Sequence, residues 1–160
     1  MDYYGMEVLA MSNDAPINDL DVSTPDDLVF DAPLGTETVL IVDDEPLVLR
    51  LCCSILARQG YHVLGAGSAQ EALEFCENEA RELHLLLSDI IMPKLRGVDL
   101  AARVSMIYPE IRILFMSGFD NRQIPEYEAL RSQARLIAKP FTARELLLAV
   151  RAALDKPPGM

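Results

Sequence analysis

Residues 39–46 read VLIVDDEP, and this short stretch decides the fold class. A run of four apolar residues, three of them β-branched, is typical of a strand covered on both faces of a parallel sheet. Three acidic residues end the run, and Pro46 stands where a first helical residue is favourable. The stretch therefore predicts a strand, a polar turn and a helix in that order, which is the start of a β-α unit.

The same alternation of short apolar runs and longer amphipathic stretches continues along the chain. We expect five strands, at residues 39–42, 61–64, 83–87, 111–116 and 134–138. Apolar residues recur at helical spacing between them, at positions 47, 51 and 55, then 100, 104 and 107, and finally 146, 150 and 154. The pattern predicts an α/β fold built on a five-stranded parallel sheet.

Several helix ends are marked by local signals. Residues 68–71 and 142–145 each match a capping box, in which a hydroxyl and a carboxylate satisfy unpaired amides at a helix start. Pro157 and Pro158 would end the last helix. Pro125 interrupts the stretch 121–133, so we expect the fourth helix to be short or irregular.

Charge is distributed unevenly along the 160 residues. The net charge is −11, yet residues 1–35 alone hold eight acids and no Lys or Arg. We interpret residues 1–35 as a flexible acidic extension, residues 36–156 as one domain, and residues 157–160 as a tail. Without a basic stripe, direct nucleic-acid binding is disfavoured.

The cysteines and the apolar runs indicate a cytoplasmic location. Cys52, Cys53 and Cys76 show neither metal-ligand spacing nor an even disulfide framework, which fits a reduced compartment. No signal peptide is evident, and no apolar run is long enough to cross a bilayer.

Polar residues follow four of the five expected strands. Asp43 and Asp44 follow the first, Asp89 the third, Ser117 the fourth and Lys139 the fifth. The carboxyl ends of parallel strands share one edge, so these side chains can meet. Clustered carboxylates call for a hard cation such as Mg²⁺, which is usually shared between carboxylates and phosphate. An aspartate can also be a nucleophile that forms an acyl phosphate, with a lysine neutralising the phosphoryl charge and a serine sensing it.

Four motifs in this order resemble the receiver domain of two-component response regulators. They are VDDE at 42–45, DIIMPKLRG at 89–97, MSG at 116–118 and KPF at 139–141. The resemblance covers roughly residues 36–156 and implies that Asp89 is the phosphoacceptor. It also implies that Asp43, Asp44 and Asp89 bind Mg²⁺ with the backbone carbonyl of Ile91, and that Lys139 and Ser117 contact the phosphoryl group.

The resemblance carries further structural expectations. It implies a doubly wound, flavodoxin-like sheet with strand order 2-1-3-4-5 and helices on both faces; a receiver is among the standard examples of this order. Met92, Pro93 and Gly97 would shape the loop after the third strand, and Pro140 would follow a cis peptide bond. Receivers commonly have Tyr or Phe as a rotating switch three positions before the lysine, and here that position is Leu136.

The function these residues favour is a signalling module in a two-component phosphorelay, not an enzyme that turns over outside substrates. A histidine kinase or phosphotransfer protein would donate to Asp89. Because no output domain follows Lys156, we expect the output to be a partner protein, self-association as a homodimer or phosphate relay, unless the chain is a receiver excised from a larger hybrid kinase.

Two alternatives use the same residues. A receiver-shaped interaction module that is not phosphorylated would be consistent with Leu136. A Mg²⁺-dependent aspartyl phosphohydrolase would need an Asp-x-Asp nucleophile on the first strand and a cap over the substrate, whereas Asp43 is followed directly by Asp44.

Overall fold

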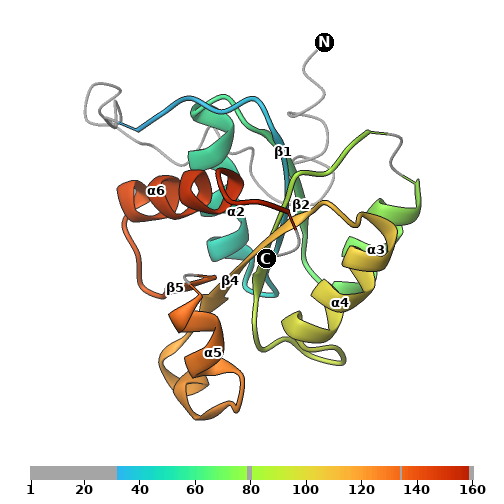
Figure 1. Cartoon of the computed structure of the whole chain (residues 1–160), viewed down its shortest axis with the longest axis vertical. Helices are drawn as coiled ribbons and strands as arrows, with labels where there is room; N and C mark the ends of the chain where they lie inside the picture. The colour runs from blue at the N-terminus through green and yellow to red at the C-terminus, as the bar shows by residue number, and fades with distance from the viewer. Residues whose placement is uncertain (1–31, 79–80, 134, 159–160) are drawn as a thin grey trace.

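Five strands form one parallel sheet in the computed structural model, which describes residues 32–78, 81–133 and 135–158 (Figure 1). The strands are β1 (Thr38–Val42), β2 (His62–Ala66), β3 (Leu85–Asp89), β4 (Arg112–Ser117) and β5 (Leu136–Ala138). Their order in the sheet is β2-β1-β3-β4-β5, and every neighbouring pair is parallel. The predicted α/β class and strand order are confirmed.

Helices cover both faces of the sheet. They are α2 (Pro46–Arg58), α3 (Ala69–Asn78), α4 (Gly97–Ile107), the 3₁₀ helix η3 (Phe119–Gln123), α5 (Tyr127–Ser132) and α6 (Ala143–Leu154). Helices α2 and α6 pack on one face with alternate residues of β1, β3 and β4, and α3 and α4 pack on the other (Figure 1). Because strand side chains alternate between faces, each central strand supplies both cores and must be apolar throughout.

Helix α2 is present as predicted, but its buried face is not the one that the sequence indicated. Leu47 and Leu51 are 68% and 50% exposed, whereas Leu49, Cys52, Cys53 and Leu56 are buried. Residues spaced four apart form a stripe that drifts around a helix of 3.6 residues per turn. Positions 47 and 51 lie on the part of this stripe that faces solvent. The buried set is spaced i, i+3, i+4 and i+7, and the two cysteines pack as small apolar side chains.

The two predicted capping boxes, at the starts of α3 and α6, differ in the structure. Thr142 and Glu145 form the complete capping box at the start of α6. At α3, Ser68 Oγ accepts from the Glu71 amide at 3.1 Å, but the Glu71 carboxylate accepts from the Gly67 amide at 2.8 Å. The predicted box is therefore wrong in one half, because the carboxylate reaches one residue further back.

The fourth β-α connection is split as expected from Pro125. The 3₁₀ helix η3 ends at Gln123, and α5 is only six residues long. The split leaves a short, separately oriented segment directly after β4, below the sheet in Figure 1.

Part of the stretch assigned to the acidic extension contacts the domain. Gln59 donates from its side-chain amide to the Ala32 carbonyl at 2.6 Å, and the Gly35 amide donates to the Gln59 carbonyl at 3.0 Å. A Cβ at Gly35 would collide with the ring of Tyr61, so glycine lets the chain pass close to that ring. Residues 1–31 lie outside the described residues.

Candidate functional site

Three carboxylates converge at the carboxyl edge of the central strands. Asp43 and Asp44 directly follow β1, and Asp89 is the last residue of β3, which pairs with β1. One oxygen from each lies within 4.8 Å of the others. Asp43 and Asp89 are buried, whereas Asp44 is exposed. The parallel pairing of β1 and β3 thus brings together carboxylates 45 positions apart in sequence.

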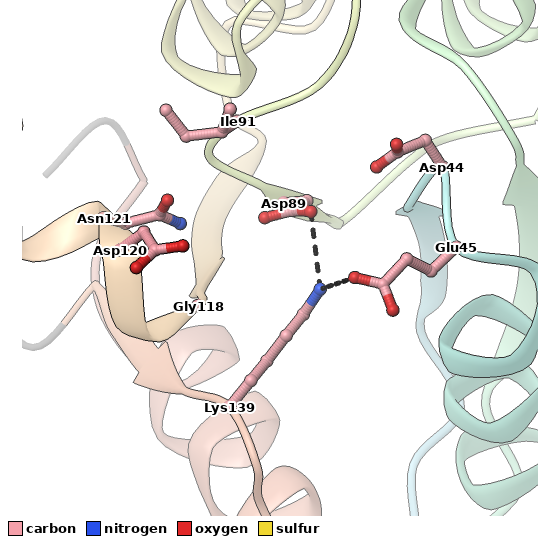
Figure 2. Close-up of a pocket in the computed structure, with 8 residues that line it drawn as sticks. All are labelled: Asp44, Glu45, Asp89, Ile91, Gly118, Asp120, Asn121 and Lys139. Carbon is pink, nitrogen blue, oxygen red and sulfur yellow. Dashed lines mark hydrogen bonds and ion pairs between the residues drawn. The ribbon is translucent and has the colours of Figure 1, made fainter.

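Lys139 supplies the counter-charge from the end of β5. Its Nζ lies 2.7 Å from Asp43 Oδ2. It also lies 3.4 Å from Asp89 Oδ2 and 3.9 Å from Glu45 Oε1 (Figure 2). The Lys139–Pro140 peptide bond is cis, as the resemblance implied. Asp43 Oδ1 also accepts from the Glu45 amide at 2.9 Å, so both of its oxygens are engaged although the side chain is fully buried.

Burial and charge shift the pKa values of Asp89 and Lys139. Desolvation raises the pKa of Asp89 to about 6; Asp43 and Asp44 add to the rise, and Lys139 opposes it. Burial also lowers the pKa of Lys139, but its hydrogen bonds and charge interactions with Asp43 and Asp89 outweigh that effect and leave the pKa above its ordinary value. The cluster holds more negative charge than one lysine balances, and a divalent cation would complete it.

The site opens to solvent as a pocket of about 220 Å³. It is lined by Asp44, Glu45, Asp89, Ile91, Gly118, Asp120, Asn121 and Lys139 (Figure 2). Ile91 is therefore at the pocket. Ser117 is not among the lining residues: it is buried at the end of β4, and its carbonyl accepts from the Lys139 amide at 2.7 Å.

Two lining residues, Asp120 and Asn121, were not identified from the sequence. They lie three and four positions after Ser117, on η3, whereas the polar residues predicted from the sequence stand at the expected strand ends. The signal that could have found them is their position at the same sheet edge as the other polar strand ends.

The loop after β3 is tightly constrained. Met92 is buried, and Pro93 is exposed and accepts a hydrogen bond within the loop. The Gly97 amide donates to the Ile90 carbonyl at 2.7 Å, which brings the start of α4 against the end of β3. A Cβ at Gly97 would collide with the backbone carbonyl of Asp89, so only glycine fits this approach.

Replacing Gly97 with alanine is expected to destabilise the fold by about 2–3 kcal/mol, because backbone must move to relieve the overlap. The displaced backbone carries Asp89, so this member of the carboxylate cluster would move too. Gly118→Ala is the matched control, since a Cβ there meets nothing within 4 Å. Urea unfolding of both variants checks this; equal midpoints would contradict the predicted overlap.

Leu136 lies at the start of β5 opposite Phe115. It is partly buried and packs against the core shared by α3 and α4. The loop after β3 is also tied to the segment after β4, because Arg96 pairs with Glu126 at 3.1 Å. These contacts link the surroundings of Asp89 to η3, α5 and β5.

Comparison with known proteins agrees with this geometry. A family model described as the response regulator receiver domain matches residues 39–151. The chain belongs to the response regulator receiver family. Receivers are signalling modules of two-component systems, they interact with histidine kinases or phosphotransfer proteins, and they generally bind Mg²⁺ at an acidic pocket.

Two curated relatives come from Brucella abortus. The response regulator receiver protein CpdR is 34% identical over 110 residues, which cover 68% of this chain and 89% of CpdR. The sensor kinase CckA is 31% identical over 122 residues, which cover 76% of this chain but 13% of CckA. The chain thus spans most of one relative and a small part of the other.

Solved receiver structures share the fold. A CheY-like receiver domain protein from Methanospirillum hungatei has a TM-score of 0.64 and 30% identity, covering 76% of this chain and 95% of that one. The receiver domain of the hybrid histidine kinase CckA has a TM-score of 0.61 and 26% identity, covering 74% and 99%. No helix among the described residues of this receiver is long and apolar enough to cross a membrane.

Proposed function

We propose that this receiver accepts a phosphoryl group on Asp89, with Mg²⁺, and thereby switches a protein-interaction surface. The observation that carries the proposal is the cluster itself: Asp89 faces an open pocket, with Lys139 Nζ 3.4 Å from its Oδ2 and two further carboxylates beside it. A nucleophile, a fixed cation and a set of metal-binding oxygens are what phosphoryl transfer to an aspartate requires.

The proposed reaction is a displacement at phosphorus. An oxygen of the Asp89 carboxylate attacks, the bond from phosphorus to the donor nitrogen of a phosphohistidine breaks, and the electron pair leaves with the imidazole. Asp43, Asp44 and Asp89, with the Ile91 carbonyl, would hold a magnesium ion, which neutralises charge on the phosphoryl oxygens. Lys139 then turns from Asp89 to a phosphoryl oxygen while Asp43 anchors its ammonium group.

Transmission of the signal would run through the segments after β4 and β3. Ser117 ends β4 and Gly118 precedes η3, so a hydrogen bond from the Ser117 hydroxyl or the Gly118 amide to a phosphoryl oxygen would shift the start of η3. The Arg96–Glu126 pair couples the same segment to the loop after Asp89. A phosphoryl group that favours one arrangement of η3, α5 and β5 shifts a two-state equilibrium and changes the surface offered to a partner protein.

Leu136 favours a second candidate, a receiver-shaped interaction module without phosphorylation. A leucine in the switch position can repack, but it has no hydroxyl to offer a partner. The intact carboxylate cluster and Lys139 support the phosphorylated module over this alternative.

Incubation with Mg²⁺ and a small acyl-phosphate donor, followed by intact mass measurement, tests the proposal. We expect one added phosphoryl group, absent when the metal is chelated. Borohydride reduction and peptide mass spectrometry would locate the modification at Asp89. No adduct, together with no stabilisation by a fluoroberyllate analogue of the phosphoryl group, would contradict the proposal and favour the constitutive module.

A further inference from the structure

The 3₁₀ helix η3 places two polar side chains in the phosphoacceptor pocket that the proposed reaction has not used. Asp120 and Asn121 line the pocket together with Asp89, Ile91 and Lys139. Figure 2 shows both side chains directed from η3 toward Asp89, on the side of the pocket away from Asp44 and Glu45. They therefore flank the space that a phosphoryl group on Asp89 would enter.

Asn121 has an unusual environment for an amide. The residue is only 7% exposed, and its backbone is engaged: the amide donates to Gly118 and the carbonyl accepts from Ile124, each at 3.2 Å. Within the described residues, no protein hydrogen bond involves its side chain. The polar atoms of this side chain are not sealed from solvent, because the residue lines the open pocket, so their hydrogen-bond partner has to be water or a ligand. The pocket is where that partner can bind.

Asp120 differs from the other carboxylates of the pocket. Asp44 and Asp89 belong to the cluster that can hold a cation, and Glu45 lies 3.9 Å from Lys139. Asp120 is exposed and forms no ion pair within the described part of the chain. Its oxygens are free to accept a proton from a water molecule that Asn121 holds.

We propose that Asn121 and Asp120 position the water that hydrolyses the acyl phosphate on Asp89, and that they thereby set the lifetime of the phosphorylated state. The water oxygen attacks phosphorus opposite the Asp89 oxygen. Asp120 takes the proton from the water, the bond between phosphorus and the Asp89 oxygen breaks, and the electron pair returns to the Asp89 carboxylate. Inorganic phosphate leaves, and Asp120 releases the proton to solvent. This inference rests on the proposed phosphorylation of Asp89.

The test measures phosphorylation of the chain and hydrolysis of the acyl phosphate in separate steps. The full chain is loaded with the acyl-phosphate donor and Mg²⁺, the donor is removed, and the remaining phosphoprotein is followed by intact mass. We expect Asp120→Asn and Asp120→Ala to load like the unmodified chain but to lose the phosphoryl group about 10- to 100-fold more slowly, as removal of a general base would require. Asn121→Ser should slow the loss about tenfold through poorer positioning of the water.

Two controls test whether the Asp120 carboxylate acts as a general base. Glu128→Gln removes an exposed carboxylate from the neighbouring helix α5, outside the pocket, and should leave the rate of loss unchanged. Added formate, a small carboxylate base, should accelerate the loss in Asp120→Ala and not in the unmodified chain, which an altered fold would not produce. Normal loading with an unchanged rate of loss in Asp120→Asn, or no formate rescue, would overturn this inference alone. Failure of the unmodified chain to load would overturn the phosphorylation of Asp89, and this inference with it.

Discussion

Asparagine in place of Asp89 is expected to abolish phosphoryl uptake and also to stabilise the metal-free protein at neutral pH. The first effect follows from loss of the nucleophilic oxygen. The second follows from burial: the side chain is 9% exposed, and desolvation raises its pKa from 3.8 to about 6. The ionised carboxylate is thus a cost to the fold, and a neutral amide of the same shape avoids it.

The direction of the pH dependence follows from the raised pKa of Asp89. Between pH 4 and pH 6 the native state binds the Asp89 proton more tightly than the unfolded chain does, so this group makes the protein less stable as pH rises through that window. Each pKa unit corresponds to about 1.4 kcal/mol, so the cost at pH 7.5 is about 3 kcal/mol. Asp89→Asn should recover most of it at pH 7.5 and none at pH 4.

Chemical unfolding at pH 4 and pH 7.5, without metal, measures this difference. Mg²⁺ should stabilise the unmodified chain more than the variant, because the variant offers one carboxylate fewer to the cation. Glu110→Gln is a suitable control, since Glu110 is an exposed carboxylate in the loop before β4, at the opposite end of the sheet. If Asp89→Asn were less stable than the unmodified chain at pH 7.5, the electrostatic cost assigned to Asp89 would be wrong.

The sheet could be predicted from the sequence because of how parallel strands are buried. Val39 to Val42 face helices on both sides, so the whole run is apolar and ends abruptly in aspartates. The face of α2 could not be chosen in the same way, because Leu47 and Leu49 are equally apolar. Which of them is buried depends on how the helix is rotated against β1 and β3, and that is a tertiary property.

In the site, too, some residues could be predicted from the sequence and others could not. Asp43 and Lys139 directly follow strands and Asp89 ends one, and parallel strands end at one edge, so their meeting follows from the topology. Asp120 and Asn121 are placed by a 3₁₀ turn, whose path depends on Pro125 and on the tie between Arg96 and Glu126. The Glu71 carboxylate likewise accepts from the Gly67 amide and not from the Ser68 amide, so the capping motif did not predict this local geometry.

Methionine in place of Lys139 should have the opposite effect on stability to Asp89→Asn, although both changes alter the same cluster. Asp43 is fully buried, and the Lys139 ammonium group at 2.7 Å is its cationic partner within the described residues. Removing one member of a buried pair leaves an uncompensated charge, so we expect a loss of about 2–4 kcal/mol at neutral pH, together with about a hundredfold slower phosphoryl uptake.

Removing both charges distinguishes an orphaned carboxylate from a packing defect. Lys139→Met combined with Asp43→Asn should recover much of the lost stability, because the unpaired charge at the fully buried Asp43 is then removed. The double variant should still fail to take up a phosphoryl group at the normal rate, since the cation is missing. Lys94→Met, in an exposed residue of the loop after β3, controls for loss of a lysine alone. If the double variant were as unstable as the sum of the two single changes, the energies would be additive and Lys139 would not be compensating Asp43.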